Sequence, residues 1–261
     1  MPEGLRMHGN PPFRVAVVHG GPGAAGDMAP VARSLGAAMG VLEPLQSAVT
    51  VRGQAEELAH ILEGYGSPPM VVIGFSWGAW LACITASQYP SLIGKLILIG
   101  CPSFEEKDAA GMNAVRMQRL PDAERVEVLT LLRRLDAPAA KEKDAAFARL
   151  GALLSKTDAF DPVEDDEDFV LCSHEVFTRV WGEAAEWRRN GTLLASVKRI
   201  RCPVVAIHGE HDPHPAGGSE KSLSAAFGNF RFVLLKACGH KPWIERRARD
   251  AFFQILEGEL R

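Results

Sequence analysis

Short continuous apolar runs alternate along the chain with longer stretches in which apolar residues recur at helical spacing. A continuous apolar run is typical of a strand that is covered on both faces of a parallel sheet. The runs predict strands at Arg14–Val18, Gly40–Leu42, Met70–Ile73, Lys95–Ile99, Val204–Ile207 and Arg231–Leu235. The longer stretches predict helices at Asp27–Ala37, Val51–Glu63, Trp77–Gln88, Ser219–Phe227 and Pro242–Leu256. This alternation predicts an α/β fold with a mostly parallel sheet of about six strands flanked by helices.

The middle of the chain breaks this rhythm. Residues 104–197 carry no strand-like run, and amphipathic helices are expected at Glu124–Leu135, Lys141–Leu154 and Ser173–Arg189. An acidic stretch, Glu164–Asp168, lies between the last two. We therefore expect a core made of residues 1–103 and 198–261, with residues 104–197 inserted as a helical cap. Caps of this kind close over a site and set its specificity.

Charge and cysteine usage exclude several classes of function. The net charge of −3 offers no basic surface for nucleic acid. No apolar run approaches the ~20 residues of a membrane span, and the N-terminus lacks the apolar region of a signal peptide. The five cysteines are scattered without a C-x-x-C pair, which favours reduced thiols in the cytoplasm. We expect a cytoplasmic monomer or homodimer that acts on a small molecule, with no nucleic acid and no membrane as partner.

The sequence Gly74-Phe75-Ser76-Trp77-Gly78 stands between an expected strand and an expected helix. In that context G-x-S-x-G indicates a nucleophile elbow, a sharp turn that lifts the serine hydroxyl above the sheet. The turn crowds the backbone, so the flanking positions need residues without a side chain. Ser76 is therefore the candidate nucleophile.

Two further strand ends supply an acid and a base. The strand Val204–Ile207 runs into His208-Gly209-Glu210-His211-Asp212, and the last strand runs into Gly239-His240. The carboxyl ends of parallel strands share one edge of the sheet, where sites are built. Near the first strand, the Gly-rich loop His19–Gly23 exposes backbone N–H groups, so the N–H groups of Gly21 and Trp77 are the expected oxyanion donors.

Together these motifs resemble a serine-type α/β-hydrolase, and His19-Gly20-Gly21-Pro22-Gly23 with the elbow is similar to the proline iminopeptidase branch. The resemblance covers Val15–Pro102 and Ile200–Leu256. It implies the α/β-hydrolase fold, Ser76 as nucleophile, His240 as base and Asp212 as the acid that orients it. The chain departs from the branch after Leu42, where the D-x-x-G-x-G-x-S loop is missing, and before Val15, where few residues are left for further strands.

Several assignments keep an alternative. Glu210 can replace Asp212 as the acid, and His208, His211 and His214 lie close to the expected base in sequence. The substrate-binding candidates are Trp80 and, on a cap helix, Glu175. The histidines and cysteines lack zinc-type spacing, so no metal and no cofactor are expected. The expected activity is hydrolysis of a small carboxylic ester or amide; the alternatives are aminopeptidase-like cleavage, in which cap carboxylates bind the substrate amine, and a non-catalytic binding protein.

Overall fold

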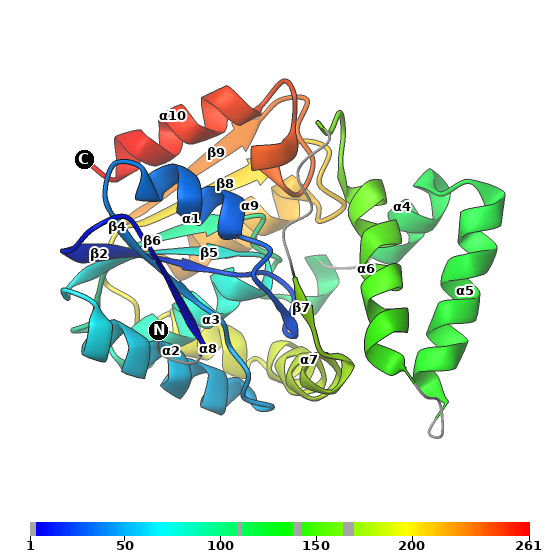
Figure 1. The fold of residues 1–261 in the computed structure, drawn as a ribbon, viewed down its shortest axis with the longest axis horizontal. Helices are drawn as coiled ribbons and strands as arrows, with labels where there is room; N and C mark the ends of the chain where they lie inside the picture. The colour runs from blue at the N-terminus through cyan, green and yellow to red at the C-terminus, as the bar shows by residue number, and fades with distance from the viewer. Residues whose placement is uncertain (1–3, 109–110, 138–141, 164–169) are drawn as a thin grey trace.

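A computed structural model describes residues 4–108, 111–137, 142–163 and 170–261. Its centre is a seven-stranded sheet in the order β1-β4-β2-β5-β6-β8-β9 (Figure 1). The strands are β1 (Leu5–His8), β2 (Phe13–Val18), β4 (Gly40–Pro44), β5 (Met70–Phe75), β6 (Ile93–Ile99), β8 (Val204–Gly209) and β9 (Phe230–Leu235). All neighbouring strands in this sheet are parallel except β1 and β4. The mostly parallel sheet expected from the sequence is confirmed.

The strand β1 is the seventh strand of the sheet, where about six were expected, and it is formed by the few residues that precede β2. It is a short edge strand that pairs antiparallel with β4, from Leu5 opposite Pro44 to His8 opposite Val41. Edge strands are commonly short and polar, so they lack the apolar run by which buried strands are recognised. Here Arg6 and His8 both contact the buried carboxylate of Glu43.

Successive residues of the central strands point to opposite faces of the sheet and build two hydrophobic clusters. The first cluster joins Val72 and Leu96 to α2 (Val51–Tyr65), α3 (Trp77–Gln88) and α9 (Ala216–Ala226). The second joins Ile73 and Ile97 to α1 (Ala29–Gly36) and α10 (Arg249–Glu259). The sheet is thus covered on both faces, which explains its continuous apolar runs.

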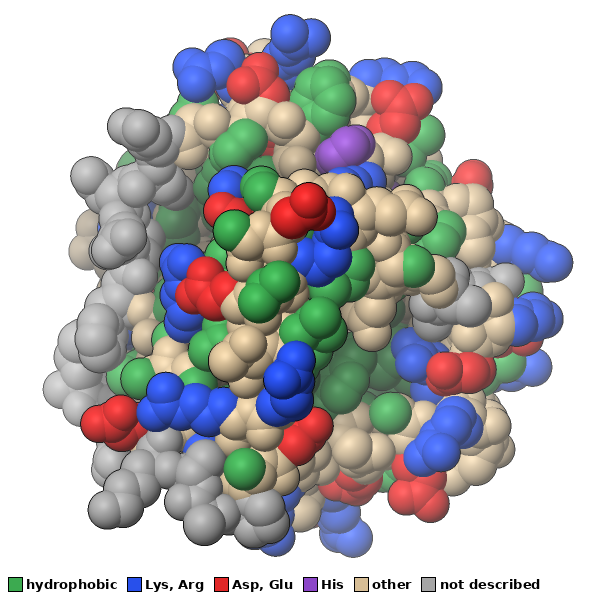
Figure 2. Space-filling view, turned by 90° about the vertical axis from the view of Figure 1, so that its right-hand side faces the viewer, with side chains coloured by type: hydrophobic (Ala, Val, Ile, Leu, Met, Phe, Trp, Pro, Cys, Tyr) green, Lys and Arg blue, Asp and Glu red, His purple; other side chains and the backbone are tan. Residues whose placement is uncertain are grey.

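Residues 104–197 begin with the short 3₁₀ helix η1 (Glu106–Asp108) and form two packing units. Helices α4 (Met112–Arg119), α5 (Asp122–Asp136) and α6 (Lys143–Asp158) enclose a small cluster of their own, beside the edge of the sheet to which β8 and β9 point (Figure 1). Helices α7 (His174–Arg189) and α8 (Thr192–Val197) instead contribute to the main core through residues such as Val180 and Leu193. On the face that carries the cap, acidic and basic side chains are interspersed around a hollow with hydrophobic side chains on its floor (Figure 2).

One strand in this segment was not expected. The two-residue strand β7 (Leu171–Cys172) pairs antiparallel with β3 (Ala24–Ala25), which follows the Gly-rich loop. A two-residue strand leaves no periodicity in the sequence, so the pairing is visible only in three dimensions. The acidic stretch Glu164–Asp168 lies outside the described residues. In the described ranges, no helix combines the length and the apolar character needed to cross a bilayer.

Candidate active site

Ser76 occupies a strained turn between β5 and α3. Its backbone has φ 51° and ψ −113°, a conformation that an L-residue adopts only when its surroundings impose it. The flanking glycines are required by close backbone contacts. A Cβ on Gly74 would lie 2.3 Å from the carbonyl oxygen of Gly78, and a Cβ on Gly78 would lie 2.4 Å from the carbonyl oxygen of His19. The elbow geometry expected from G-x-S-x-G is therefore present, with Ser76 half-buried at its tip.

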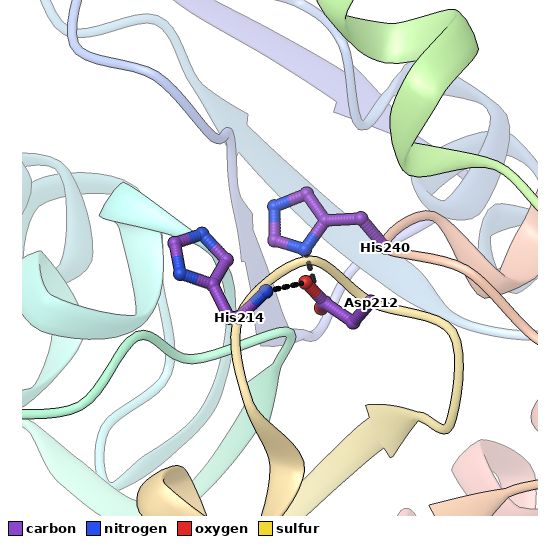
Figure 3. A group of neighbouring side chains, drawn as sticks. All are labelled: Asp212, His214 and His240. Atoms are coloured by element: carbon purple, nitrogen blue, oxygen red, sulfur yellow. Dashed lines mark hydrogen bonds and ion pairs between the residues drawn. The ribbon is translucent and has the colours of Figure 1, made fainter. Parts of the chain in front are cut away.

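Asp212 and His240 form a buried pair beyond the ends of β8 and β9. The Nδ1 atom of His240 lies 2.6 Å from Oδ2 of Asp212 (Figure 3). Burial opposes ionisation of Asp212, but the neighbouring His240 and His208 hold the pKa of its carboxyl well below the usual range. Asp212 is thus a carboxylate that accepts a hydrogen bond from the Nδ1–H of His240, which leaves the lone pair on Nε2 of the imidazole.

This pair is adjacent to the elbow. The imidazole of His240 packs against Phe75, the residue before Ser76, with 4.7 Å between ring centroids. Glu210, the alternative acid, is exposed and its Oε1 lies 2.5 Å from Nζ of Lys236. The structure therefore brings His240 to Asp212 and directs Glu210 elsewhere.

The turn that carries Asp212 is held by two further histidines. The backbone N–H of His214 donates to Oδ1 of Asp212 at 2.8 Å, and Nε2 of His208 lies 2.9 Å from the carbonyl oxygen of His214. His214 itself is buried, and its imidazole lies 5.1 Å from that of His240 between centroids. Burial lowers the pKa of His214 to about 3 despite the raising effect of Asp212.

Gly100, which sequence reasoning did not single out, makes room for the base. It follows β6 with φ +54°, and a Cβ at this position would lie 2.8 Å from both Cε1 and Nδ1 of His240. The only sequence signal is a glycine just past the end of a central strand. Its contact with His240, far along the chain, cannot be read from that signal.

The Gly-rich loop lies beside the elbow. Gly21 has φ +30°, and its carbonyl accepts a hydrogen bond from the N–H of Ala24. His19 is buried behind the loop, where its Nε2 accepts from the backbone N–H of Gln46 at 3.3 Å and its Nδ1 donates to the carbonyl of Gly20 at 2.7 Å. Burial lowers the pKa of His19, so its neutral form holds the loop.

The cap braces the same loop. The backbone N–H of Ser173, at the start of α7, donates to the carbonyl of Gly23 at 2.8 Å. A Cβ on Gly23 would lie 2.3 Å from the carbonyl oxygen of Ser173, so only glycine permits this approach. The loop that carries the expected donor Gly21 is therefore attached to the cap as well as to the sheet.

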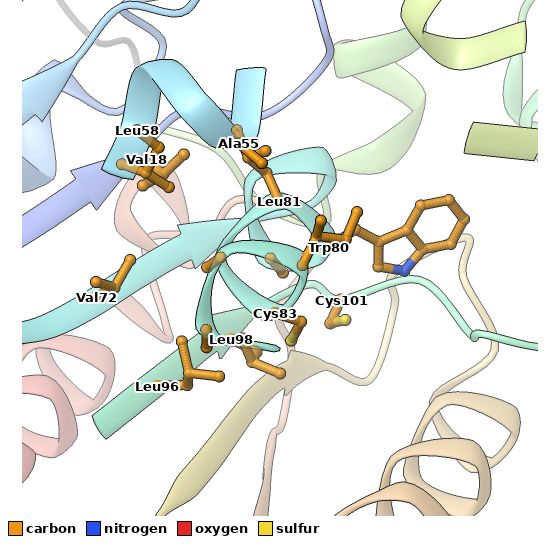
Figure 4. Packing of buried hydrophobic residues seen from close by; sticks show 14 of the residues in the cluster. Val18, Ala55, Leu58, Val72, Trp80, Leu81, Cys83, Leu96, Leu98 and Cys101 are labelled. Carbon is orange, nitrogen blue, oxygen red and sulfur yellow. The ribbon is translucent and has the colours of Figure 1, made fainter. Parts of the chain in front are cut away.

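The two tryptophans at the start of α3 are both fully buried. The indole N–H of Trp77 donates to Oε1 of Gln54 in α2, which places this side chain in the core and leaves its backbone N–H as the expected oxyanion donor. Figure 4 shows α3 between the sheet residues Leu96 and Leu98 and the α2 residues Ala55 and Leu58. Helix α3 is consequently fixed on several sides, which holds the elbow rigid.

Trp80, a candidate for substrate binding, connects the core to the cap. Its indole stacks on Trp181 of α7 with 5.7 Å between centroids and an interplanar angle of 6°. The guanidinium of Arg188 lies over the same ring, 5.5 Å from its centroid. Glu175, the other candidate, is exposed at the start of α7 and pairs with Arg179 at 3.3 Å.

A fully buried carboxylate, Glu245, ties the His240 loop to the cap. Its Oε1 accepts from the backbone N–H groups of Gly239 and Phe160, and its Oε2 from that of Asp161, each at 2.8 Å. The residues around Glu245 also differ from expectation, because the single helix expected at Pro242–Leu256 is interrupted there. The segment is a short 3₁₀ helix (η2, Pro242–Ile244), an extended Glu245, and α10 from Arg249. The apolar residues keep helical spacing across the interruption, so the sequence pattern did not reveal it.

The structure also assembles a group that sequence spacing had excluded. One ligand atom each from Asp212, His214 and His240 lies within 4.8 Å of the others, and all three residues are buried. The expectation of no metal site relied on local spacing in the sequence. The grouping depends instead on Asp212 and His214 meeting His240 at the edge of the sheet.

A pocket adjoins the acid turn from the cap side. It has a volume of about 400 Å³ including its mouth, and His211 contributes to its wall. The remaining lining residues come from the α4–α6 region: Arg119, Leu120, Glu124, Lys156, Thr157 and Ala159. His211 therefore lies on the pocket side of the turn, and Asp212 faces His240.

The comparisons with known proteins show the family and the fold. A family model described as the alpha/beta hydrolase family matches residues 8–255. The chain belongs to the alpha/beta hydrolase family. The expected α/β-hydrolase fold is thereby confirmed, as is the resemblance at the level of the superfamily.

Similar proteins are distant in sequence. The human monoacylglycerol lipase ABHD6 is 20% identical over 205 residues, which are 78% of this chain and 59% of that protein. The chain therefore spans less than two thirds of the length of this relative. A meta-cleavage product hydrolase from Pseudomonas fluorescens (CumD) aligns with a TM-score of 0.65 and 17% identity, covering 98% of this chain and 94% of its own. A thermophilic esterase from Thermogutta terrifontis gives a TM-score of 0.63 and 18% identity, covering 97% and 92%. The two solved structures share the fold.

Proposed function

We propose that this alpha/beta hydrolase is a serine hydrolase that cleaves a small carboxylic ester through Ser76, His240 and Asp212. The observation that carries the proposal is the 2.6 Å contact between His240 and Asp212. The imidazole of His240 packs against Phe75, the residue that precedes Ser76. A carboxylate, an imidazole and a serine elbow in this relationship are the parts of nucleophilic acyl transfer.

In the proposed reaction, Nε2 of His240 takes the proton of Ser76 as the hydroxyl oxygen attacks the carbonyl carbon of the ester. The backbone N–H groups of Gly21 and Trp77 stabilise the negative charge that develops on the carbonyl oxygen. The protonated His240 then gives its proton to the leaving alcohol, and an acyl-enzyme remains. Water, deprotonated by the same imidazole, releases the acid and regenerates Ser76. Asp212 holds the tautomer throughout.

An ester is favoured over an amine-bearing peptide because the cap carboxylates outside the acidic stretch already have partners or are exposed. Glu175 is paired with Arg179, and Oε2 of Glu183 accepts from the backbone N–H of Val51 at 2.8 Å. Glu186 is exposed. The names of the lipase and the esterase among the similar proteins support the same substrate class. The scattered free thiols support a cytoplasmic location for the proposed enzyme.

The direct test is labelling with a fluorophosphonate followed by intact-mass measurement. We expect one adduct per chain in the wild type and none in Ser76→Ala. Circular dichroism confirms that both proteins are folded. An adduct that persists in Ser76→Ala, or folded wild type that takes no label, contradicts the assignment of Ser76.

The substrate class has its own test. We expect p-nitrophenyl esters of short acids to turn over faster than alanyl- or prolyl-naphthylamide. N-acetylation of the naphthylamide is the control for amine recognition. If the free amine raises kcat/KM at least tenfold over the acetylated form, the ester proposal is replaced by the aminopeptidase-like reaction.

A further inference from the structure

Two buried imidazoles lie side by side at the centre of the site. His214 and His240 are 7% and 6% exposed, and Figure 3 shows their rings facing a common space above Asp212. The rings are 5.1 Å apart between centroids and tilted by 46°. Only the imidazole of His240 has an assigned role in the proposed reaction.

The ring nitrogens of His214 are not engaged by the neighbouring side chains. Within the described part of the chain neither nitrogen has a hydrogen-bond partner, although the backbone N–H and carbonyl of the same residue are both bonded. For His240 the partner is on Nδ1 only. Both ring nitrogens of His214, and Nε2 of His240, therefore keep their lone pairs or N–H groups available to a ligand.

We propose that His214 and His240 together bind a divalent cation of the zinc type. Imidazole nitrogen is a preferred ligand of zinc, and the clustered ligand atoms lie within 4.8 Å of one another. Two nitrogens on one tetrahedral zinc ion lie about 3.3 Å apart, given bonds of about 2.05 Å. Binding therefore requires the two ligand nitrogens to lie closer together than the 4.8 Å limit of the cluster.

Asp212 prepares His240 for this role. A metal-binding histidine commonly donates its second ring N–H to a carboxylate, which fixes the tautomer and raises the basicity of the ligating nitrogen. The contact from His240 Nδ1 to Asp212 has this arrangement. Binding therefore needs no proton transfer: the Nε2 lone pair of His240 forms the bond to the cation, and the Nδ1–H of His240 continues to donate to Asp212.

The consequence for activity rests on the proposed function. The Nε2 lone pair that binds the cation is the one that would accept the proton of Ser76, so an occupied site has no general base. Zinc should act as a reversible inhibitor that competes with catalysis. Mg²⁺, which prefers oxygen ligands, should not.

The test measures binding and inhibition separately. Calorimetric titration with Zn²⁺ should show one site per chain in the wild type and in Ser76→Ala, and loss of that site in His214→Gln. With p-nitrophenyl acetate as substrate, the Zn²⁺ concentration for half-inhibition should rise at least tenfold in His214→Gln, relative to the rate of that variant without metal. His211→Gln is the matched control: it removes an imidazole from the same turn but outside the cluster, so it should keep the wild-type response.

Diffraction from zinc-soaked crystals of the wild type covers the case in which His214→Gln does not fold. An anomalous peak between the imidazoles of His214 and His240 supports the site. Equal zinc affinity in wild type and folded His214→Gln, or anomalous peaks only elsewhere, overturns it. If the protein proves not to be a hydrolase, calorimetry and diffraction still decide the metal site.

Discussion

The backbone N–H of His240 donates a hydrogen bond of 2.8 Å to the carbonyl of Asp158, the last residue of α6. The proposed base is therefore attached to the cap at its own main chain. The carboxylate of Asp158 is held in turn by Arg116 of α4, through bonds of 2.7 and 2.5 Å. Together with Glu245, these contacts make the position of the cap part of the geometry of the site.

The Arg116–Asp158 pair should contribute strongly to stability. Both side chains are largely buried, at 15% and 8% exposure, so Arg116→Met leaves an uncompensated charge inside the protein. We expect a loss of about 3–5 kcal/mol in the free energy of unfolding, measured by urea titration. The matched control is Arg149→Met, which breaks the exposed pair with Glu127 on the neighbouring helices and should leave the midpoint unchanged. Equal effects of the two substitutions would contradict this expectation.

Gly100→Ala should reduce activity by displacing the base. The added Cβ would meet the His240 ring at 2.8 Å, and a displacement of about 1 Å from productive geometry lowers kcat by roughly 10²-fold. Gly111→Ala is the control for backbone strain, since Gly111 also has a positive φ but open space around its Cβ position. Ester hydrolysis measured on both variants separates the contact from the strain. A kcat for Gly100→Ala within twofold of Gly111→Ala would show that the ring is not displaced.

The acid can be identified by exchanging one carboxylate at a time. Asp212→Asn should lower kcat by about 10⁴-fold, because an amide cannot hold the required imidazole tautomer. Glu210→Gln should leave kcat/KM unchanged, since Glu210 is exposed and contacts Lys236. Steady-state ester hydrolysis decides between them. A larger loss in Glu210→Gln would move the acid to that position.

His214 should make stability fall with acidity. Its pKa is lowered from 6.5 to about 3, mainly by burial, so between these values the unfolded chain binds more protons than the folded one. Stability therefore rises with pH across this window. The stability that depends on neutral His214 is fully present above pH 6.5 and is lost as the pH falls toward 3. Between pH 7 and 5 the wild type should lose roughly 2 kcal/mol more than His214→Gln in urea titrations. His60→Gln, which removes an exposed imidazole, is the control for the substitution itself. If the stability of the wild type and of His214→Gln depends on pH in the same way, His214 is not the group responsible.

The sequence predicted the parts of the fold that depend on local pattern. Strands β5 and β8 are buried on both faces, so their apolar runs are continuous and easily recognised. The elbow was predictable because a turn between such a strand and a helix demands Gly74 and Gly78. Asp212 and His240 could be placed on one edge because they follow the ends of parallel strands.

The missed features depend on contacts between distant segments. Gly100 matters only because the His240 ring occupies its missing side chain, and Glu245 only because three backbone N–H groups converge on it. Neither contact changes the spacing of apolar residues. The edge strand β1 and the short β7 were missed for the related reason that neither buries two faces.

The pairing of β3 with β7 limits where the cap can be exchanged for that of another hydrolase. Replacing the cap helices with those of another hydrolase requires junctions in the chain, and two convenient junctions take part in the site. Asp158, at the end of α6, accepts a hydrogen bond from His240, and Cys172 pairs with Ala24 beside the loop that carries Gly21. A graft that starts after Gly100 and ends before α8 would replace both contacts at once. Transplanting only α5 and the first turns of α6 keeps both contacts and also keeps Arg116 of α4 on Asp158. New substrate contacts can then be introduced without moving His240 or the Gly-rich loop.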